Sequence, residues 1–137
     1  MATTTRLITV EEYGNLPDEN GVRQELVEGE LVEMPFPKLL HNLLVETIGD
    51  ILKSFVRERR LGYVLRDNTG FVLRRNPDTV RGPDVSFVGQ ERMLTADVDG
   101  YLPGAPDLAV EIVSPSDRAD AVRAKAREYI AAGSRIV

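Results

Sequence analysis

Residues 84–88 read Asp-Val-Ser-Phe-Val, and residues 107–113 read Asp-Leu-Ala-Val-Glu-Ile-Val. Each is a short apolar run rich in β-branched residues, bounded by Gly, Pro or Ser. Short runs of this kind are typical of strands inside a sheet. We therefore predict two central strands here, around which the remaining elements pack.

Two helices are expected on either side of these strands. The first covers residues 39–60, where apolar side chains recur at three- and four-residue steps. Those side chains are Leu40, Leu43, Leu44, Ile48, Ile51, Leu52 and Phe55. The second covers residues 116–132, capped by Ser116 or Asp117 and ended by Gly133.

Shorter elements complete the pattern. A capping box of Thr9 and Glu12 predicts a short helix over 9–13. A hairpin over 24–34 is expected to turn at Gly29 with a positive φ. The remaining expectations are a turn at 17–21, strands at 63–65 and 69–74, a turn at 76–78, loop or a short helix over 90–105, and the beginning of a strand at 134–137.

Length and composition predict a single α/β domain, in the wider sense that includes α+β, over residues 1–137. Its last strand stops after a few residues, so we expect that a C-terminal segment completing the sheet is missing. The sequence has no apolar run long enough to cross a membrane and no secretory signal, so a cytoplasmic protein without a membrane partner is expected.

The composition excludes several kinds of site. Cysteine is absent and there is one histidine, which rules out a thiol nucleophile and the usual zinc spacings. No Walker loop, G-x-G-x-x-G or G-x-S-x-G motif occurs. The net charge of −5 argues against a non-specific nucleic-acid binder, which is normally basic. It is compatible with a carboxylate metal site, where the bound cation reverses the local charge.

Two acids lie where a charge is costly. Asp84 begins one apolar run and Glu111 lies inside the other. A carboxylate in a dry sheet needs a cation, hydrogen bonds or a raised pKa. Two carboxylates on adjacent strands therefore indicate a site for Mg²⁺ or Mn²⁺. The alternative is that Glu111 faces solvent on an edge strand and Asp84 caps a turn.

Three further residues are candidates. Lys125, on the second helix, can fold back over the carboxylates, although it also fits an ordinary charged helix face. Glu25 is a possible third acid within a stretch whose acidity is otherwise typical of a surface. His41, at the start of the long helix, either reaches a functional site or serves as a cap or packing residue.

These residues occur in an order that resembles a known family. It runs from Glu25-Leu-Val-Glu-Gly-Glu30 through His41 to Arg81-Gly-Pro-Asp84-Val-Ser, Pro106-Asp-Leu-Ala-Val-Glu111-Ile-Val-Ser-Pro-Ser116, Lys125, Tyr129 and Gly133. From about Thr9 onward, the chain resembles the Uma-type restriction-endonuclease-like proteins of the PD-(D/E)-x-K nuclease superfamily. The resemblance implies a restriction-endonuclease-like fold, with a mixed central sheet flanked by helices and C-terminal strands that continue beyond this chain.

The resemblance also implies residue roles. Asp84 and Glu111 would be the two acids of the superfamily motif. The lysine expected two residues after the second acid is replaced by Val113, so its role would pass to Lys125. Glu25 matches an acid that the superfamily often adds, and His41 matches a family histidine. Asp84, Glu111 and the carbonyl of Ile112 would hold Mg²⁺ or Mn²⁺.

The expected function is metal-dependent hydrolysis of phosphodiester bonds, with DNA a better candidate substrate than RNA. A catalytically silent nucleic-acid-binding or regulatory module with the same fold is the alternative. The long helix has a broad apolar face, so a homodimer is compatible with either function.

Overall fold

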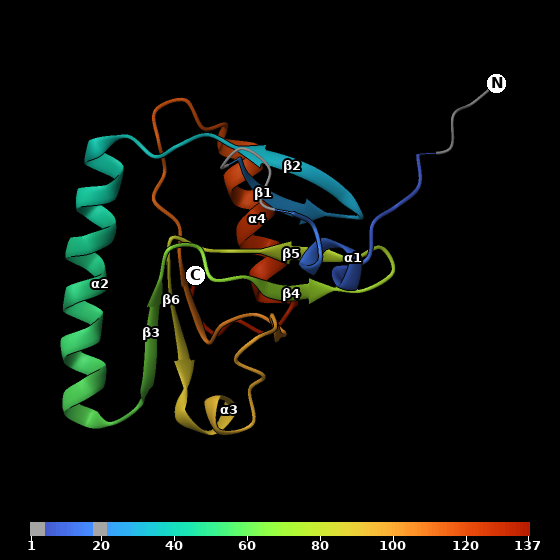
Figure 1. Cartoon of the computed structure of the whole chain (residues 1–137). Helices are drawn as coiled ribbons and strands as arrows, with labels where there is room; N and C mark the ends of the chain where they lie inside the picture. The colour runs from blue at the N-terminus through green and yellow to red at the C-terminus, as the bar shows by residue number, and fades with distance from the viewer. Residues whose placement is uncertain (1–4, 18–21) are drawn as a thin grey trace.

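The computed structural model describes residues 5–17 and 22–137, and these residues form an α+β fold (Figure 1). Its helices are α1 (Val10–Gly14), α2 (Leu39–Arg59), α3 (Gln90–Leu94) and α4 (Ala119–Ala131). Its strands are β1 (Arg23–Val27), β2 (Glu30–Met34), β3 (Gly62–Arg66), β4 (Phe71–Arg74), β5 (Thr79–Arg81), β6 (Val85–Gly89), β7 (Leu102–Pro103) and β8 (Leu108–Val110). The predicted mixture of strands and flanking helices is confirmed.

One sheet has the strand order β2-β1-β5-β4-β7, antiparallel except for the parallel pair β4 and β7. The predicted hairpin is confirmed in β1 and β2. Its turn residues Glu28 and Gly29 have φ of 50° and 81°. Positive φ at both turn positions suits the twist of a two-residue hairpin. Strands β5 and β7 were not predicted, and the turn expected at 17–21 lies, apart from Pro17, outside the described residues.

The other sheet has the order β3-β6-β8, with antiparallel pairing throughout. Strand β6 lies at its centre, as predicted. The prediction for the second run was too long, because β8 ends at Val110 and Glu111 follows the strand. The expected strand at 134–137 is reduced to a single parallel bridge between Leu108 and Ile136.

Helix α2 lies beside β3 at one side of the molecule (Figure 1). It buries Val45, Gly49 and Val56. Arg66 at the end of β3 forms ion pairs with Glu46 and Asp50 of α2. A side chain at position 49 would place its Cβ 2.3 Å from Nε of Arg66, so Gly49 leaves the room that the Arg66 side chain occupies.

The short helix α1 confirms the predicted capping box, with bonds in both directions between Thr9 and Glu12. The prediction for the start of α4 was wrong. The helix begins at Ala119 after Arg118, and no side chain caps it. Asp117 instead accepts a hydrogen bond from the Ser114 amide at 2.7 Å, which closes the preceding turn. Gly133 ends the helix with φ of 115°, as expected.

Among the described residues, two small clusters of buried apolar side chains belong to the core. Val10, Leu26 and Val80 join α1 to the five-stranded sheet. Ala105, Ala109 and Tyr129 join β8 to α4. The second cluster fixes α4 over the end of β8, where the candidate site lies. No helix in residues 5–17 and 22–137 combines the length and apolar character needed to cross a membrane.

Candidate active site

The two predicted acids lie at the same end of the three-stranded sheet. Asp84 directly precedes β6, and Glu111 directly follows β8. These strands are antiparallel, and Val85 is the partner of Val110. One step further in this register brings position 84 opposite position 111, and opposite residues of an antiparallel pair share a face. The fold thus brings together two carboxylates that are 27 positions apart in the sequence.

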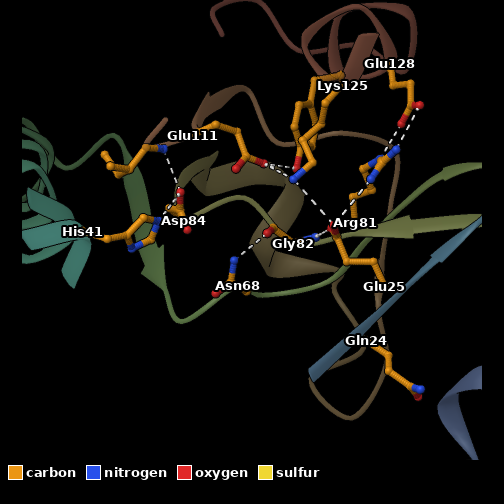
Figure 2. A network of polar contacts seen from close by, with 12 residues as sticks. Gln24, Glu25, His41, Asn68, Arg81, Gly82, Asp84, Glu111, Lys125 and Glu128 are labelled. Carbon is orange, nitrogen blue, oxygen red and sulfur yellow. Dashed lines mark hydrogen bonds and ion pairs between the residues drawn. The ribbon is translucent and has the colours of Figure 1, made fainter. Parts of the chain in front are cut away.

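Asp84 is buried and is held through one oxygen. Its Oδ2 accepts a hydrogen bond of 2.7 Å from the Ile112 amide. The same oxygen lies 3.3 Å from Nε2 of His41, in the first turn of α2 (Figure 2). No residue in the described part of the chain donates a hydrogen bond to Oδ1. The side chain is therefore fixed while one of its oxygens remains available for a cation.

Glu111 combines burial with several charged neighbours. Its Oε1 accepts a hydrogen bond of 2.8 Å from the Tyr129 hydroxyl and lies 3.4 Å from Nζ of Lys125. Burial is the main cause that raises the pKa of Glu111 to about 7, and the nearby charges of Asp84 and Glu25 raise it further. Lys125 and Tyr129 act in the opposite direction. The ionised carboxylate would thus be stabilised by additional positive charge.

Lys125 joins two of the predicted acids. Its Nζ lies 3.5 Å from Oε1 of Glu25 as well as 3.4 Å from Glu111, so the ammonium lies between the two carboxylates (Figure 2). Its side chain is only 18% exposed. The alternative that Lys125 belongs to an ordinary solvated helix face does not describe this position.

Glu25 comes from β1 and is anchored at both oxygens. Its Oε2 accepts a hydrogen bond of 3.0 Å from the Gly82 amide. Its Oε1 contacts Lys125 and lies 3.4 Å from the Arg81 guanidinium. Glu25 and Glu111 thus contact the same Lys125 ammonium.

Three contributors were missed as site residues. Arg81 forms two hydrogen bonds to the Glu128 carboxylate, at 2.5 and 3.1 Å, and joins β5 to α4. Tyr129 is fully buried, and its pKa is raised mainly by that burial. The spacing of Lys125, Glu128 and Tyr129 was the available signal, because residues three and four apart share one face of a helix.

His41 and Asp84 both line a hollow of about 310 Å³. The hollow is lined by Arg23, Pro37, His41, Asn42, Val45, Glu46, Arg66, Asp67, Asn68 and Asp84. The Nδ1 atom of His41 is buried without a hydrogen-bond partner among the described residues. The imidazole does not cap α2, whose N-cap is Lys38, and its Nε2 atom contacts the Asp84 carboxylate.

The available oxygen ligands decide which cation this site could hold. Among the described residues, no group of three or more acidic or histidine side chains converges to hold a metal ion. Asp84 and Glu111 each keep one oxygen without a hydrogen-bond partner in those residues, and the predicted Ile112 carbonyl would be the third ligand. Mg²⁺ commonly binds through one or two carboxylates and keeps several waters. The free carboxylate oxygens of Asp84 and Glu111 are of the donor type that such an open site uses.

Comparison with known proteins identifies a family and a shared fold. A family model described as "Uma2: Putative restriction endonuclease" matches residues 10–137. A solved structure from Anabaena variabilis, described as a putative nuclease belonging to DUF820, superposes with a TM-score of 0.74 at 23% sequence identity. The match covers 93% of this chain and 70% of that one, and it shows that the fold is shared. No curated protein sequence matches the chain significantly.

Proposed function

The chain belongs to the Uma2 family of restriction-endonuclease-like proteins. We propose that it hydrolyses phosphodiester bonds in DNA with a divalent cation at Asp84 and Glu111. The observation that carries the proposal is the position of Asp84 opposite Glu111 in the strand register, together with the contact between Glu111 and Lys125. A half-buried acid whose pKa is raised, beside a second acid and an amine, is typical of a catalytic site.

The roles of the side chains follow from their contacts. Asp84, Glu111 and the Ile112 carbonyl would hold Mg²⁺ or Mn²⁺. A divalent cation there would polarise a phosphate oxygen and lower the pKa of a bound water. Lys125 presents its ammonium beside Glu111, where it would orient the attacking water or stabilise the negative charge that develops on the phosphoryl group.

Other residues keep this geometry fixed. Tyr129 holds one oxygen of Glu111, and Glu25 holds Lys125 from the opposite side. His41 and the Ile112 amide hold one oxygen of Asp84. This set of contacts orients the reactive groups before substrate binds, which is how enzymes reduce the cost of reorganisation.

A catalytically silent binding or regulatory module is the second candidate. Lys125 already supplies a positive charge to both Glu25 and Glu111, so part of the acidity is balanced by the protein itself. The net charge of −5 also works against approach of a polyanion. A module of this kind would bind the cation or nucleic acid and leave DNA intact.

The test is cleavage of plasmid and single-stranded DNA in Mg²⁺ or Mn²⁺. We expect Asp84→Asn to reduce the rate by about 100-fold or more, as when one group that stabilises the transition state is removed. Asp99→Asn is the matched control, because Asp99 is exposed and lies outside the site. Cleavage by Asp84→Asn at the wild-type rate would remove this site from the mechanism.

Calorimetry with Mn²⁺ separates the two candidates. Binding of Mn²⁺ to the wild type, lost in Asp84→Asn and accompanied by no cleavage of any DNA, would support the silent module. Binding accompanied by cleavage supports the nuclease.

We include a homodimer in the proposal. A DNA duplex presents two strands, and two copies of one site related by a twofold axis can address both of them.

A further inference from the structure

The hollow beside Asp84 has no role in the mechanism proposed above. Its walls come from the start of β1, the first turns of α2 and the turn between β3 and β4. Asp84 belongs to its lining, whereas Glu111 and Lys125 do not. The hollow therefore adjoins the proposed cation site at Asp84 and extends from it on the side of α2.

The size of the hollow limits what can enter it. Its volume of about 310 Å³ lies at the lower end of the roughly 300–1,000 Å³ that is usual for small-molecule sites. A group the size of one nucleotide matches this volume. A DNA duplex cannot enter, because its bases are paired and stacked on their neighbours.

Several polar side chains of the wall are available to a ligand. Arg23, Asn42 and Asp67 line the hollow, and their side chains form no hydrogen bond or ion pair with another residue in the described part of the chain. A guanidinium, an amide and a carboxylate together offer the donors and acceptors that proteins use to read the edges of nucleobases.

The wall formed by the β3–β4 turn is fixed in place. Asp67 and Asn68 have φ of 60° and 55°, in the left-handed region that Asp and Asn tolerate better than most residues. The Asn68 side chain donates a hydrogen bond of 2.7 Å to the Gly82 carbonyl (Figure 2). This part of the hollow is thus formed before a ligand arrives.

The charges of the wall favour a neutral ligand over a phosphate. Arg66 is offset by its ion pairs with two acids of α2. Arg23 then adds one positive charge to the lining, against the negative charges of Asp67 and Asp84. A neutral nucleobase meets less repulsion here than a phosphate does, and a cation at Asp84 would attract the phosphate instead.

We propose that the hollow accepts one unpaired nucleotide of the DNA, with its base among Arg23, Asn42 and Asp67 and its phosphate toward the cation at Asp84. The inference rests on the proposed function and names its substrate class, which is DNA that carries a nucleotide outside the helical stack. Extrusion of a paired base has a cost in free energy that is smaller for a nucleotide that is already unpaired.

The experiment compares two labelled duplexes that differ by one extra, unpaired nucleotide in one strand. Fluorescence anisotropy in Ca²⁺ measures both affinities without requiring cleavage. We expect the bulged duplex to bind about tenfold more tightly than the fully paired one. The two duplexes carry nearly the same phosphate charge, so general attraction to the backbone contributes almost equally to both affinities.

Two variants test the wall. Arg23→Ala should lower the preference for the bulged duplex by about fivefold or more, as when one base contact of an arginine is lost. Asn42→Leu, which changes no charge, should lower it by about twofold or more. Arg59→Ala is the matched control for the lost charge, because Arg59 lies at the opposite end of α2, and it should leave the preference unchanged. Circular dichroism checks that all three variants are folded.

Equal affinity of the wild type for the two duplexes would overturn the inference, as would an undiminished preference in Arg23→Ala or Asn42→Leu. Cleavage in the plasmid assay would then leave the nuclease proposal standing. A preference that depends on Arg23 and Asn42, in a protein that cuts no DNA, would support the nucleotide site and contradict the nuclease.

Discussion

Glu111 is the residue whose chemistry is most altered by its surroundings. Burial sets its pKa near 7, well above the ordinary value of 4.5, although Lys125 and Tyr129 both favour the ionised form. Between these two pH values the folded protein binds a proton at Glu111 that the unfolded chain releases. The negative charge on Glu111 is therefore unfavourable at neutral pH when no additional cation is present.

Glu111→Gln should change how stability depends on pH. Because the pKa of Glu111 is raised on folding, its contribution to the free energy of unfolding falls as pH rises from 4.5 to 7. The loss is at most roughly 3 kcal/mol, from 1.4 kcal/mol per pKa unit. Urea denaturation of wild type and Glu111→Gln without divalent cations should show the variant gaining relative stability across this range. A constant difference at every pH would contradict this expectation.

Some neighbours in the candidate site could be predicted from the sequence, and others could not. The nearness of Asp84 and Glu111 could be predicted, because a charge in an apolar run requires an explanation and both runs are visible in the sequence. The contact between Arg81 and Glu128 could not be predicted, since both are ordinary charged residues and 47 positions separate them. Only the packing of α4 over the sheet brings them together.

At the scale of elements, the connection between β5 and β6 depends on Gly82. Its amide donates to Glu25, and its carbonyl accepts a hydrogen bond of 2.7 Å from the Asn68 side chain. A Cβ at this position would lie 2.2 Å from the Asn68 backbone oxygen. The two backbone segments approach so closely that glycine is required.

Gly82→Ala should therefore destabilise the protein by about 1–3 kcal/mol, the usual cost of overpacking. Glu25 would be displaced as well, so any cleavage activity should fall with stability. Gly14→Ala is the matched control, because a Cβ there would meet Tyr101 at an ordinary distance of 3.5 Å. Thermal unfolding of both variants checks the prediction, and equal stability of the two would contradict it.

Helices and strands could be predicted where the local sequence pattern determines them. The hairpin turn follows from Glu28-Gly29, and α2 follows from its apolar period. Strands β5 and β7 have three and two residues and owe their pairing to neighbours distant in sequence. The start of α4 was misplaced because Asp117 closes a turn, a use of an aspartate that competes with capping.

At the scale of the whole molecule, the net charge of −5 opposes binding of DNA. A cation held by Asp84 and Glu111 would place positive charge where a phosphate must approach. The affinity for DNA should therefore depend on divalent cations more strongly than on surface lysine and arginine residues.

We expect a short labelled duplex to bind in the presence of Ca²⁺, which supports binding without requiring turnover, and to bind at least about tenfold more weakly in EDTA, a difference of 1.4 kcal/mol. Fluorescence anisotropy measures both affinities. Asp84→Asn should abolish the effect of Ca²⁺, whereas Asp99→Asn should preserve it. Equal affinity with and without the cation would show that DNA binds elsewhere on the molecule.

The first turn of α2 contacts Asp84 through His41, and its middle is clasped by Arg66. Helix α2 thus connects its exposed side with the contact between His41 and Asp84. A partner that bound α2 and changed its tilt would alter the contact between His41 and Asp84. A stronger contact there would in turn favour the same tilt. The position of α2 and the orientation of Asp84 would then be coupled in both directions.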